Sequence, residues 1–310
     1  MSDGKFRLVT RSDFDGLVCA VLFKEMDMID EIKFVHPKDM QDGTILISEN
    51  DITTNLPYVK GVHTAFDHHS SETIRLADIS DNHINDAEAP SAARVVYRHY
   101  GGTEVFPYTF EELLVAVDKC DSAQFSQEDI LNPQGWVLLN FIMDPRTGLG
   151  RYKDFRVSNY QLMMELIDYC RDHAIDKILA LPDIKERVDL YMEQREDFQE
   201  QVKRCAAIHG NLVLLDLREE DIIYAGNRFV VYALLPETNI SIHLIWGLNR
   251  INMVFAVGKS IINRTSNTNI GELMLKYGGG GHRNAGTCQV DIDDAERVQQ
   301  ELIEQIIADG

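Results

Sequence analysis

The sequence lacks several features that would place it at once in a class of protein. Its five cysteines are scattered and none lies in a CxxC pair, which argues against a disulfide framework and against a zinc site built from thiolates. No apolar run approaches the roughly 18–20 residues that span a bilayer, and the N-terminal segment has no apolar signal-peptide core. We therefore expect a cytoplasmic protein with no membrane partner.

Positive charge is also scarce. The 310 residues include 30 Lys and Arg against 50 Asp and Glu, a formal net charge of −20. Long nucleic acid is therefore a poor candidate partner, because binding of a polyanion depends on Lys and Arg that neutralise phosphates. A small phosphorylated ligand is compatible with this charge, since bound divalent metals can attract phosphate locally. The simpler alternative is that the acidity only keeps the protein soluble.

The order of apolar and amphipathic segments predicts an α/β protein of two domains. In the N-terminal part, strands are expected at 6–10, 31–37, 44–48, 51–57 and 63–69, and helices at 17–28, 89–102 and 110–121. Such alternation is typical of a parallel sheet.

Two long helices are expected between 158 and 206, and the second resembles a charged connecting helix. Beyond it we expect strands at 211–217, 228–236, 240–248, 251–258 and 286–292, and a helix at 271–278. We predict an N-terminal α/β domain with a helical extension at 1–195 and a smaller mixed-sheet α/β domain at 196–310. The oligomeric state stays open, with a homodimer as one candidate.

The segment VTRSDFDGL places two carboxylates, Asp13 and Asp15, directly after the first expected strand, and Gly16 then lets the chain enter a helix. Ligands of open α/β sheets bind at the carboxyl ends of strands, and two carboxylates there can each hold a divalent cation. The alternative is that one of them merely caps helix 17–28.

A second polar group, Asp67, His68 and His69, follows another apolar run. Three such residues are costly in a buried core, which favours a functional role. Because neighbours along an extended strand point in opposite directions, we expect one imidazole to bind metal and the other to face a substrate oxygen. Asp67 would hold an imidazole in one tautomer.

In VDKCDSAQF, Asp118 and Asp121 lie about one helical turn apart near a helix end. One could complete a metal site while the other is a surface carboxylate. We favour Asp121 as the ligand, because a less periodic segment begins there and lets the side chain turn into a cleft.

The segment KYGGGGHRNAG has more glycines than the end of a helix requires. Consecutive glycines can bring backbone N–H groups close to a phosphate, and a floppy loop is the alternative. Arg264, upstream, is suited to bidentate phosphate recognition. The candidate substrate-binding residues are Arg264, Gly279, Gly280, Gly281, His282 and Arg283.

Taken together and in order, RSDFDG, FDHH, CDSAQF and YGGGGHRNAG resemble the motifs of the DHH phosphoesterase superfamily with its DHH-associated C-terminal domain. The resemblance covers most of the chain. It implies an active site between two α/β domains with two Mn²⁺ ions, or Mg²⁺ or Co²⁺ in their place.

The resemblance also implies a role for each matching residue. Asp13 would bind one ion, and Asp15, His68 and Asp121 would bind the other. His69 would lie near the nucleophile or the phosphate, and His282 with its glycine loop would bind substrate.

Two positions depart from the family's pattern. Val9 stands where the first motif often has a histidine, four residues before Asp13. Asn55 stands where related members have an aspartate that bridges both ions, and Glu49 or Asp51 is the other candidate for that role. A neutral amide bridges two cations less well than a carboxylate, so either the dinuclear centre is altered or water alone bridges.

The expected activity is hydrolysis of a short phosphorylated nucleotide by metal-activated water. A linear dinucleotide such as pGpG or pApA, nanoRNA, or pAp is the first choice, and cyclic dinucleotides, polyphosphate and pyrophosphate are alternatives. A degenerate protein that binds a nucleotide as a sensor is the non-enzymatic alternative. The segment 141–156 adds Arg146, Arg151 and Arg156, which either line the cleft or lie in a solvated loop.

Overall fold

A computed structural model describes residues 4–69, 80–151 and 154–310. Its contacts divide the chain into two compact units. The first comprises Met1–Gln124, Gln134–Pro145 and Gly150–Val188, and the second comprises Phe125–Pro133, Arg146–Leu149 and Asp189–Gly310. The first contains a parallel sheet and the second a mixed sheet, each with helices, so the predicted α/β fold class is confirmed.

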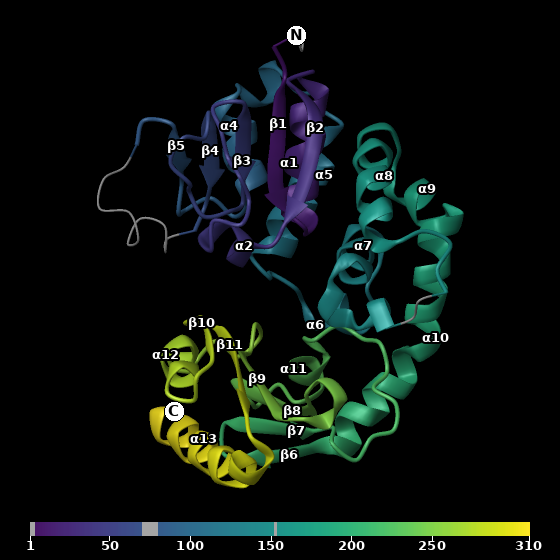
Figure 1. Ribbon diagram of the computed structural model, residues 1–310. Helices are drawn as coiled ribbons and strands as arrows, with labels where there is room; N and C mark the ends of the chain where they lie inside the picture. The colour runs from purple at the N-terminus through teal and green to yellow at the C-terminus, as the bar shows by residue number, and fades with distance from the viewer. Residues whose placement is uncertain (1–3, 70–79, 152–153) are drawn as a thin grey trace. The chain divides into compact units, whose positions relative to one another are not determined.

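The N-terminal sheet has the strand order β2-β1-β3-β4-β5, and every neighbouring pair is parallel (Figure 1). Its strands are β1 (Phe6–Arg11), β2 (Ile29–Val35), β3 (Asp51–Thr54), β4 (Thr64–Asp67) and β5 (His83–Asn85). The chain leaves β1 for β2 on one side and then continues with β3 on the other. This reversal is the point at which open α/β sheets bind their ligands.

One face of this sheet is covered by a buried helix, α1 (Phe14–Glu25), which packs against α4 (Ala92–His99), α5 (Phe110–Asp121) and α8 (Asn159–Asp172). Val9 belongs to a separate apolar cluster with Val35, Met40 of α2 (Pro37–Gln41) and Leu56. Since Leu8 and Thr10 alternate with Val9 along β1, this cluster lies on the opposite face of the sheet.

Other helices in the described residues before the second sheet are α6 (Gln127–Leu131), α7 (Gly135–Met143), α9 (Ile175–Leu179) and α10 (Pro182–Cys205). The long connecting helix expected from the sequence corresponds to α10. Arg187 on α10 is buried and donates to the carbonyls of Asp183 and Val157. The division between the units and the predicted boundary at residue 195 both fall within this helix.

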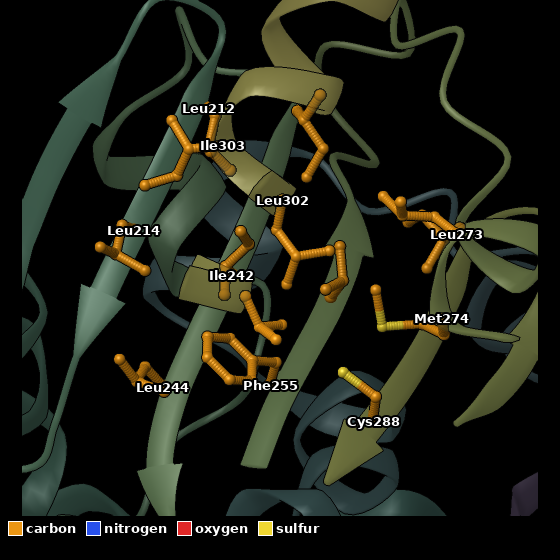
Figure 2. Close-up of a cluster of buried hydrophobic side chains, with 14 of the residues drawn as sticks. Leu212, Leu214, Ile242, Leu244, Phe255, Leu273, Met274, Cys288, Leu302 and Ile303 are labelled. Carbon is orange, nitrogen blue, oxygen red and sulfur yellow. The ribbon is translucent and has the colours of Figure 1, made fainter. Parts of the chain in front are cut away.

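The second sheet has the order β10-β11-β9-β8-β7-β6, in which only β7 and β8 run parallel. Its strands are β6 (Ala206–His209), β7 (Leu212–Asp216), β8 (Ile240–Trp246), β9 (Met253–Lys259), β10 (Gly280–His282) and β11 (Ala285–Val290). Alternate residues of the central strands, including Leu214, Ile242 and Phe255, form one core with residues of α12 (Ile270–Leu275) and α13 (Ala295–Asp309) (Figure 2).

Two expectations about local structure are wrong. Residues 228–236 contain a helix, α11 (Val230–Leu234), where a strand was expected, because a short apolar run does not distinguish a buried helix from a buried strand. Residues 44–48 form no strand, and Ile45 and Ile47 instead pack on the Val9 cluster. The floppy loop given as the alternative for the glycine segment does not apply to Gly280–His282, which form β10. No helix in the described parts of the chain is long and apolar enough to cross a membrane.

Candidate active site

The carboxyl ends of β1, β3 and β4 bring several of the predicted site residues to one edge of the parallel sheet. Asp13 follows β1, Asn55 follows β3, and Asp67 is the last residue of β4, directly before the two histidines. Because β1, β3 and β4 are successive neighbours in the sheet, residues far apart in sequence meet there. Asp121 reaches the same edge as the last residue of α5.

Asp15, His68 and Asp121 form a compact cluster. Each offers one atom that could bind a metal, and these atoms lie within 4.8 Å of one another. His68 Nε2 is 3.1 Å from Asp121 Oδ2 and 3.8 Å from Asp15 Oδ2. Two carboxylates and an imidazole at these distances match the donors that hold Mn²⁺ and similar ions.

The ring of His68 is oriented by the main chain. Its Nδ1 lies 3.2 Å from the carbonyl oxygen of Ala89, and a carbonyl can only accept, so Nδ1 carries a proton and Nε2 is left to face the two carboxylates. Nε2 is buried and, despite its proximity to Asp121, makes no hydrogen bond of ordinary geometry within the described residues. An imidazole fixed through Nδ1 with an open Nε2 is the usual arrangement of a metal-binding histidine. The residues present therefore fit one divalent ion.

Asp15 lies in the first turn of α1, and its fully buried carboxylate faces the start of α4. Its two oxygens accept from the backbone N–H groups of Ala92 and Ala93, at 2.9 and 2.8 Å. Burial and the charge of Asp121 nevertheless raise the pKa of Asp15 to about 7. Burial alone would lower the pKa of His68, but Asp121 and Asp15 raise it to about 9. A bound cation would relieve the repulsion that produces these shifts.

Asp67 orients His69 and not His68. Its Oδ1 lies 2.7 Å from His69 Nδ1, and this contact raises the pKa of His69. The side chain of Asp67 is buried, whereas that of His69 is 41% exposed. With Nδ1 engaged, Nε2 is the nitrogen of His69 that can reach a ligand.

The expectation that the two imidazoles point in opposite directions is wrong. Their ring centroids are only 4.5 Å apart. The physical reason is that β4 ends at Asp67, so the alternation of an extended strand does not apply to His68 and His69.

Asp13 is placed differently from Asp15. Its Oδ1 accepts from the N–H of Gly16 at 2.9 Å and so caps α1, as the simpler interpretation of this motif expected. Arg11 Nε lies 2.9 Å from its Oδ2, and Asn55 Nδ2 lies 3.1 and 3.3 Å from its two oxygens. Asp13 is therefore surrounded by donors of the protein itself.

The structure also separates the candidates for the bridging aspartate. Asn55 is next to Asp13, as described above. Asp51 instead binds Arg7 at 2.6 Å and the N–H of Ser48, and Glu49 is exposed. Asn55 therefore occupies the position at which a bridging carboxylate was sought.

Asp118 has a structural role. Its oxygens accept from Ser91 Oγ at 2.7 Å and from Arg94 Nε at 2.8 Å, which ties α5 to the start of α4. Asp121, not Asp118, therefore lies in the cluster with His68.

The candidate substrate-binding residues lie in the second unit, around the β10–β11 hairpin. A Cβ on Gly279 would lie 2.2 Å from the carbonyl oxygen of Thr287, and one on Gly281 2.3 Å from that of Ala285. These two glycines are thus required for packing, while a Cβ on Gly280 would meet nothing within 4 Å. The glycine pattern alone is therefore no proof of a phosphate-binding loop.

The polar residues of this region have local contacts. His282 Nδ1 accepts from the N–H of Asn284, and Arg264 Nε donates to the carbonyl of Ile261. Arg283 is close enough to lower the pKa of Lys259, after burial as the larger cause. Binding of substrate by Arg264, Gly279, Gly280, Gly281, His282 and Arg283 stays a prediction.

Of the arginines in 141–156, Arg156 is tied to α10. Its Nε lies 3.3 Å from Asp183 and its N–H donates to Glu186. Arg146 and Arg151 lie in short 3₁₀ turns at Pro145–Thr147 and Leu149–Arg151. For Arg156 this geometry indicates a structural contact.

The groups that sequence reasoning missed are mostly backbone atoms. The carbonyl of Ala89 and the N–H groups of Ala92 and Ala93 carry no side-chain signature. Arg11 could have been noticed, because it is a cation within the RSDFDG motif, two residues before Asp13.

Comparisons with known proteins place these motifs in a family. The chain matches no protein-family model, and no curated protein matches it. Among solved structures, it is 61% identical to the pGpG-specific phosphodiesterase PggH from Vibrio cholerae, over 99% of this chain and 100% of that one, with a TM-score of 0.89.

More distant structures share the fold alone. RecJ from Thermus thermophilus, solved with Mn²⁺, is 13% identical over 98% of this chain and 52% of its own, with a TM-score of 0.58. CDC45 from Entamoeba histolytica is 8% identical over 97% of this chain and 95% of its own, with a TM-score of 0.50. With the motifs RSDFDG, FDHH and CDSAQF at the edge of the sheet and a full-length relative at 61% identity, the chain belongs to the DHH superfamily of phosphoesterases.

Proposed function

We propose that this protein is a metal-dependent phosphodiesterase that hydrolyses short linear dinucleotides, with pGpG as its first substrate. The single observation that carries this proposal is the full-length similarity, at 61% identity, to a phosphodiesterase specific for pGpG. The cluster of Asp15, His68 and Asp121 provides the chemistry, because its open histidine nitrogen and paired carboxylates fit a divalent cation.

We propose Mn²⁺ as the native ion, with Mg²⁺ and Co²⁺ as substitutes. A divalent ion bound at this cluster would lower the pKa of a water molecule and so supply hydroxide near neutral pH. The protein's own part is to keep the ligands in place: Ala89 holds the ring of His68, and the start of α4 holds Asp15.

His69 is proposed to act on the phosphate or the leaving oxygen. Its pKa is raised by the hydrogen bond to the buried Asp67, so a larger fraction of the imidazole is protonated near neutral pH. A protonated, half-exposed His69 can donate through Nε2 to an oxygen on which negative charge develops. We propose that His282 and the residues around it contact the remainder of the dinucleotide.

The test is an activity panel with and without Mn²⁺. We expect hydrolysis of pGpG and pApA to exceed that of pAp, cyclic di-GMP, cyclic di-AMP and polyphosphate, and to stop when the metal is chelated. An Asp121→Ala variant should lose most of this activity, because it removes one carboxylate ligand. Asp30→Asn is the matched control, since Asp30 is an exposed carboxylate on β2.

Nucleotide binding without turnover of any phosphoester in the presence of metal would contradict the enzymatic proposal and favour the sensor. Preferential hydrolysis of a cyclic dinucleotide would keep the enzyme and replace its substrate. Cytoplasmic location and a homodimer remain predictions, and light scattering on the purified protein decides the second.

A further inference from the structure

We propose that each active site binds a single divalent ion, and that Arg11 and Asn55 replace the second ion expected from the family resemblance. This inference rests on the proposed metal-dependent function. It departs from the expectation of two ions because Asp13 already accepts from Gly16 and Asn55 and lies beside Arg11.

The surroundings of Val9 disfavour a second ion. A histidine ligand at this position would have to point toward the edge that carries Asp13, but Val9 is fully buried in an apolar cluster with Val35, Met40 and Leu56. Val9 has no group that binds metal, and its immediate neighbours in the cluster are also apolar. One of the ligands expected for a second ion is therefore missing, and no described polar residue of this cluster replaces it.

The conformation and contacts of Asn55 also disfavour a second ion. Its side chain is 1% exposed and its φ is +54°, a left-handed conformation that Asn and Asp tolerate better than other non-glycine residues. Its amide Nδ2 faces both oxygens of Asp13, at 3.1 and 3.3 Å. The reverse orientation of the amide would bring its oxygen against a carboxylate, which is unfavourable. Asn55 therefore presents a donor to Asp13, while its buried Oδ1 has no hydrogen-bond partner among the described residues.

The positive charge of Arg11 also disfavours a second ion beside Asp13. Its Nε lies 2.9 Å from Asp13 Oδ2, with the side chain 36% exposed. Arginine keeps its charge in proteins and binds planar oxyanions. Together with Gly16 N–H and Asn55, it engages both oxygens of Asp13. A metal ion at Asp13 would have to displace these donors, and its charge would lie next to a guanidinium that repels it.

The arrangement gives Arg11 a positioning role. It holds Asp13 beside the metal cluster, near enough for the charge of Asp13 to act on Asp15, and it supplies a fixed positive charge where a second cation would otherwise be needed. Unlike a metal, this charge is neither removed by chelators nor dependent on metal concentration.

The primary experiment is metal stoichiometry on the full chain without substrate. We expect equilibrium dialysis against Mn²⁺, followed by elemental analysis, to give about one ion per chain at saturation. The electron paramagnetic resonance spectrum of the bound Mn²⁺ should be that of an isolated ion. Two ions per chain with a spin-coupled spectrum would overturn the proposal.

A pair of variants tests the cause. Arg11→Gln combined with Asn55→Asp removes the cation and adds a carboxylate, and aspartate tolerates the same backbone conformation. We expect this double variant to bind a second, weaker Mn²⁺. The control for the added carboxylate is Asn50→Asp, at an exposed residue just before β3, which should keep one ion.

Circular dichroism checks that each variant is folded. A folded double variant that still binds one ion would overturn the role assigned to Arg11 and Asn55. Arg11→Lys, which keeps the charge, should retain a stoichiometry of one. Because these measurements use no substrate, they stand apart from the proposed function: failure to hydrolyse pGpG would reject the function and leave the count of ions unaffected.

Discussion

Asp67 Oδ1 lies 2.7 Å from Nδ1 of His69, so the aspartate of the FDHH motif fixes its second histidine, while a main-chain carbonyl fixes the first. The three adjacent polar residues therefore have separate tasks. His68 faces the two carboxylates of the metal cluster, His69 is available to a ligand, and Asp67 controls the proton affinity of His69.

The first prediction concerns Asp67→Asn. The hydrogen bond to the Asp67 carboxylate and its charge raise the pKa of His69, so replacing the carboxylate by a neutral amide should lower that pKa. If protonated His69 acts as proposed, activity is lost as pH rises through its pKa, and in the variant this loss should begin at lower pH. We expect kcat to fall about 10- to 100-fold, the usual cost of removing an orienting carboxylate. The measurement is the pH dependence of kcat for pGpG.

Asp86→Asn serves as its control, because Asp86 is a carboxylate paired with the exposed Arg98. A variant at Asp67 with an unchanged pH profile would remove His69 from the proton transfer.

The second prediction concerns the pH dependence of metal binding. The pKa of Asp15 is raised to about 7 and that of His68 to about 9, so both groups are protonated at pH 6 in the metal-free protein. A cation must displace these protons. We expect the affinity for Mn²⁺ to increase from pH 6 to 9. We also expect binding of the ion to release fewer protons as pH rises. Calorimetry in buffers of different ionisation enthalpy measures the affinity and the number of protons released.

The same shifts predict the stability of the metal-free protein. A raised pKa means that the folded chain binds these protons more tightly than the unfolded chain, so this contribution to stability is lost as pH rises. For Asp15 the loss runs from about pH 4 to 7, and for His68 from about pH 6.5 to 9. The increase in Tm caused by Mn²⁺ should therefore grow with pH, and a constant increase would contradict the assignment of the ligands.

The third prediction concerns Gly16→Ala. A Cβ on Gly16 would lie 2.0 Å from the carbonyl oxygen of Arg11 and 2.6 Å from Thr10 Oγ1. The turn from β1 into α1 would have to open, which should lower the free energy of unfolding by at least about 1–3 kcal/mol, the usual cost of overpacking. Urea unfolding measures this, and a stability within 0.5 kcal/mol of the natural protein would contradict the close approach.

The fourth prediction concerns Gly280→Ala. A Cβ at Gly280 would meet nothing within 4 Å, so the urea midpoint should change little. If the glycine segment binds substrate through its backbone, the added methyl group should raise the KM for pGpG about tenfold while kcat stays nearly constant. An unchanged KM would remove Gly280 from the substrate site.

Gly279→Ala is the contrasting variant. Its Cβ would lie 2.2 Å from Thr287 O, so this substitution should lower stability whether or not the segment binds substrate. The comparison separates glycines required by packing from those required by a ligand.

The alternation of strands and helices, and the positions of polar residues after strands, allowed much of the N-terminal unit to be predicted. Asp15 and His68 meet because β1 and β4 end at the same edge of a parallel sheet, and this rule can be applied to a sequence, whereas Asp121 joins them from the end of helix α5. The sequence could not show that Asp67 forms its hydrogen bond with His69 and not with His68, because this depends on the exact residue at which β4 ends.

Other errors have similar physical causes. The apolar run around Val231 is too short for its period to be measured, and packing makes it a helix. Glycines 279 and 281 have the appearance of a ligand loop, but the close approach of two strands already accounts for them. In both cases tertiary contacts decide what local sequence leaves open.

The carbonyl that orients His68 belongs to the main chain at Ala89. Residue 89 is already a buried alanine, so a scan to alanine leaves this oxygen in place and does not test the group that sets the tautomer of the histidine. Only changes that move the backbone reach it, such as substitution of the neighbouring Pro90 or a single-residue insertion between β5 and α4. The segment 86–91 therefore acts on His68 through its main chain and not through the side chain of residue 89.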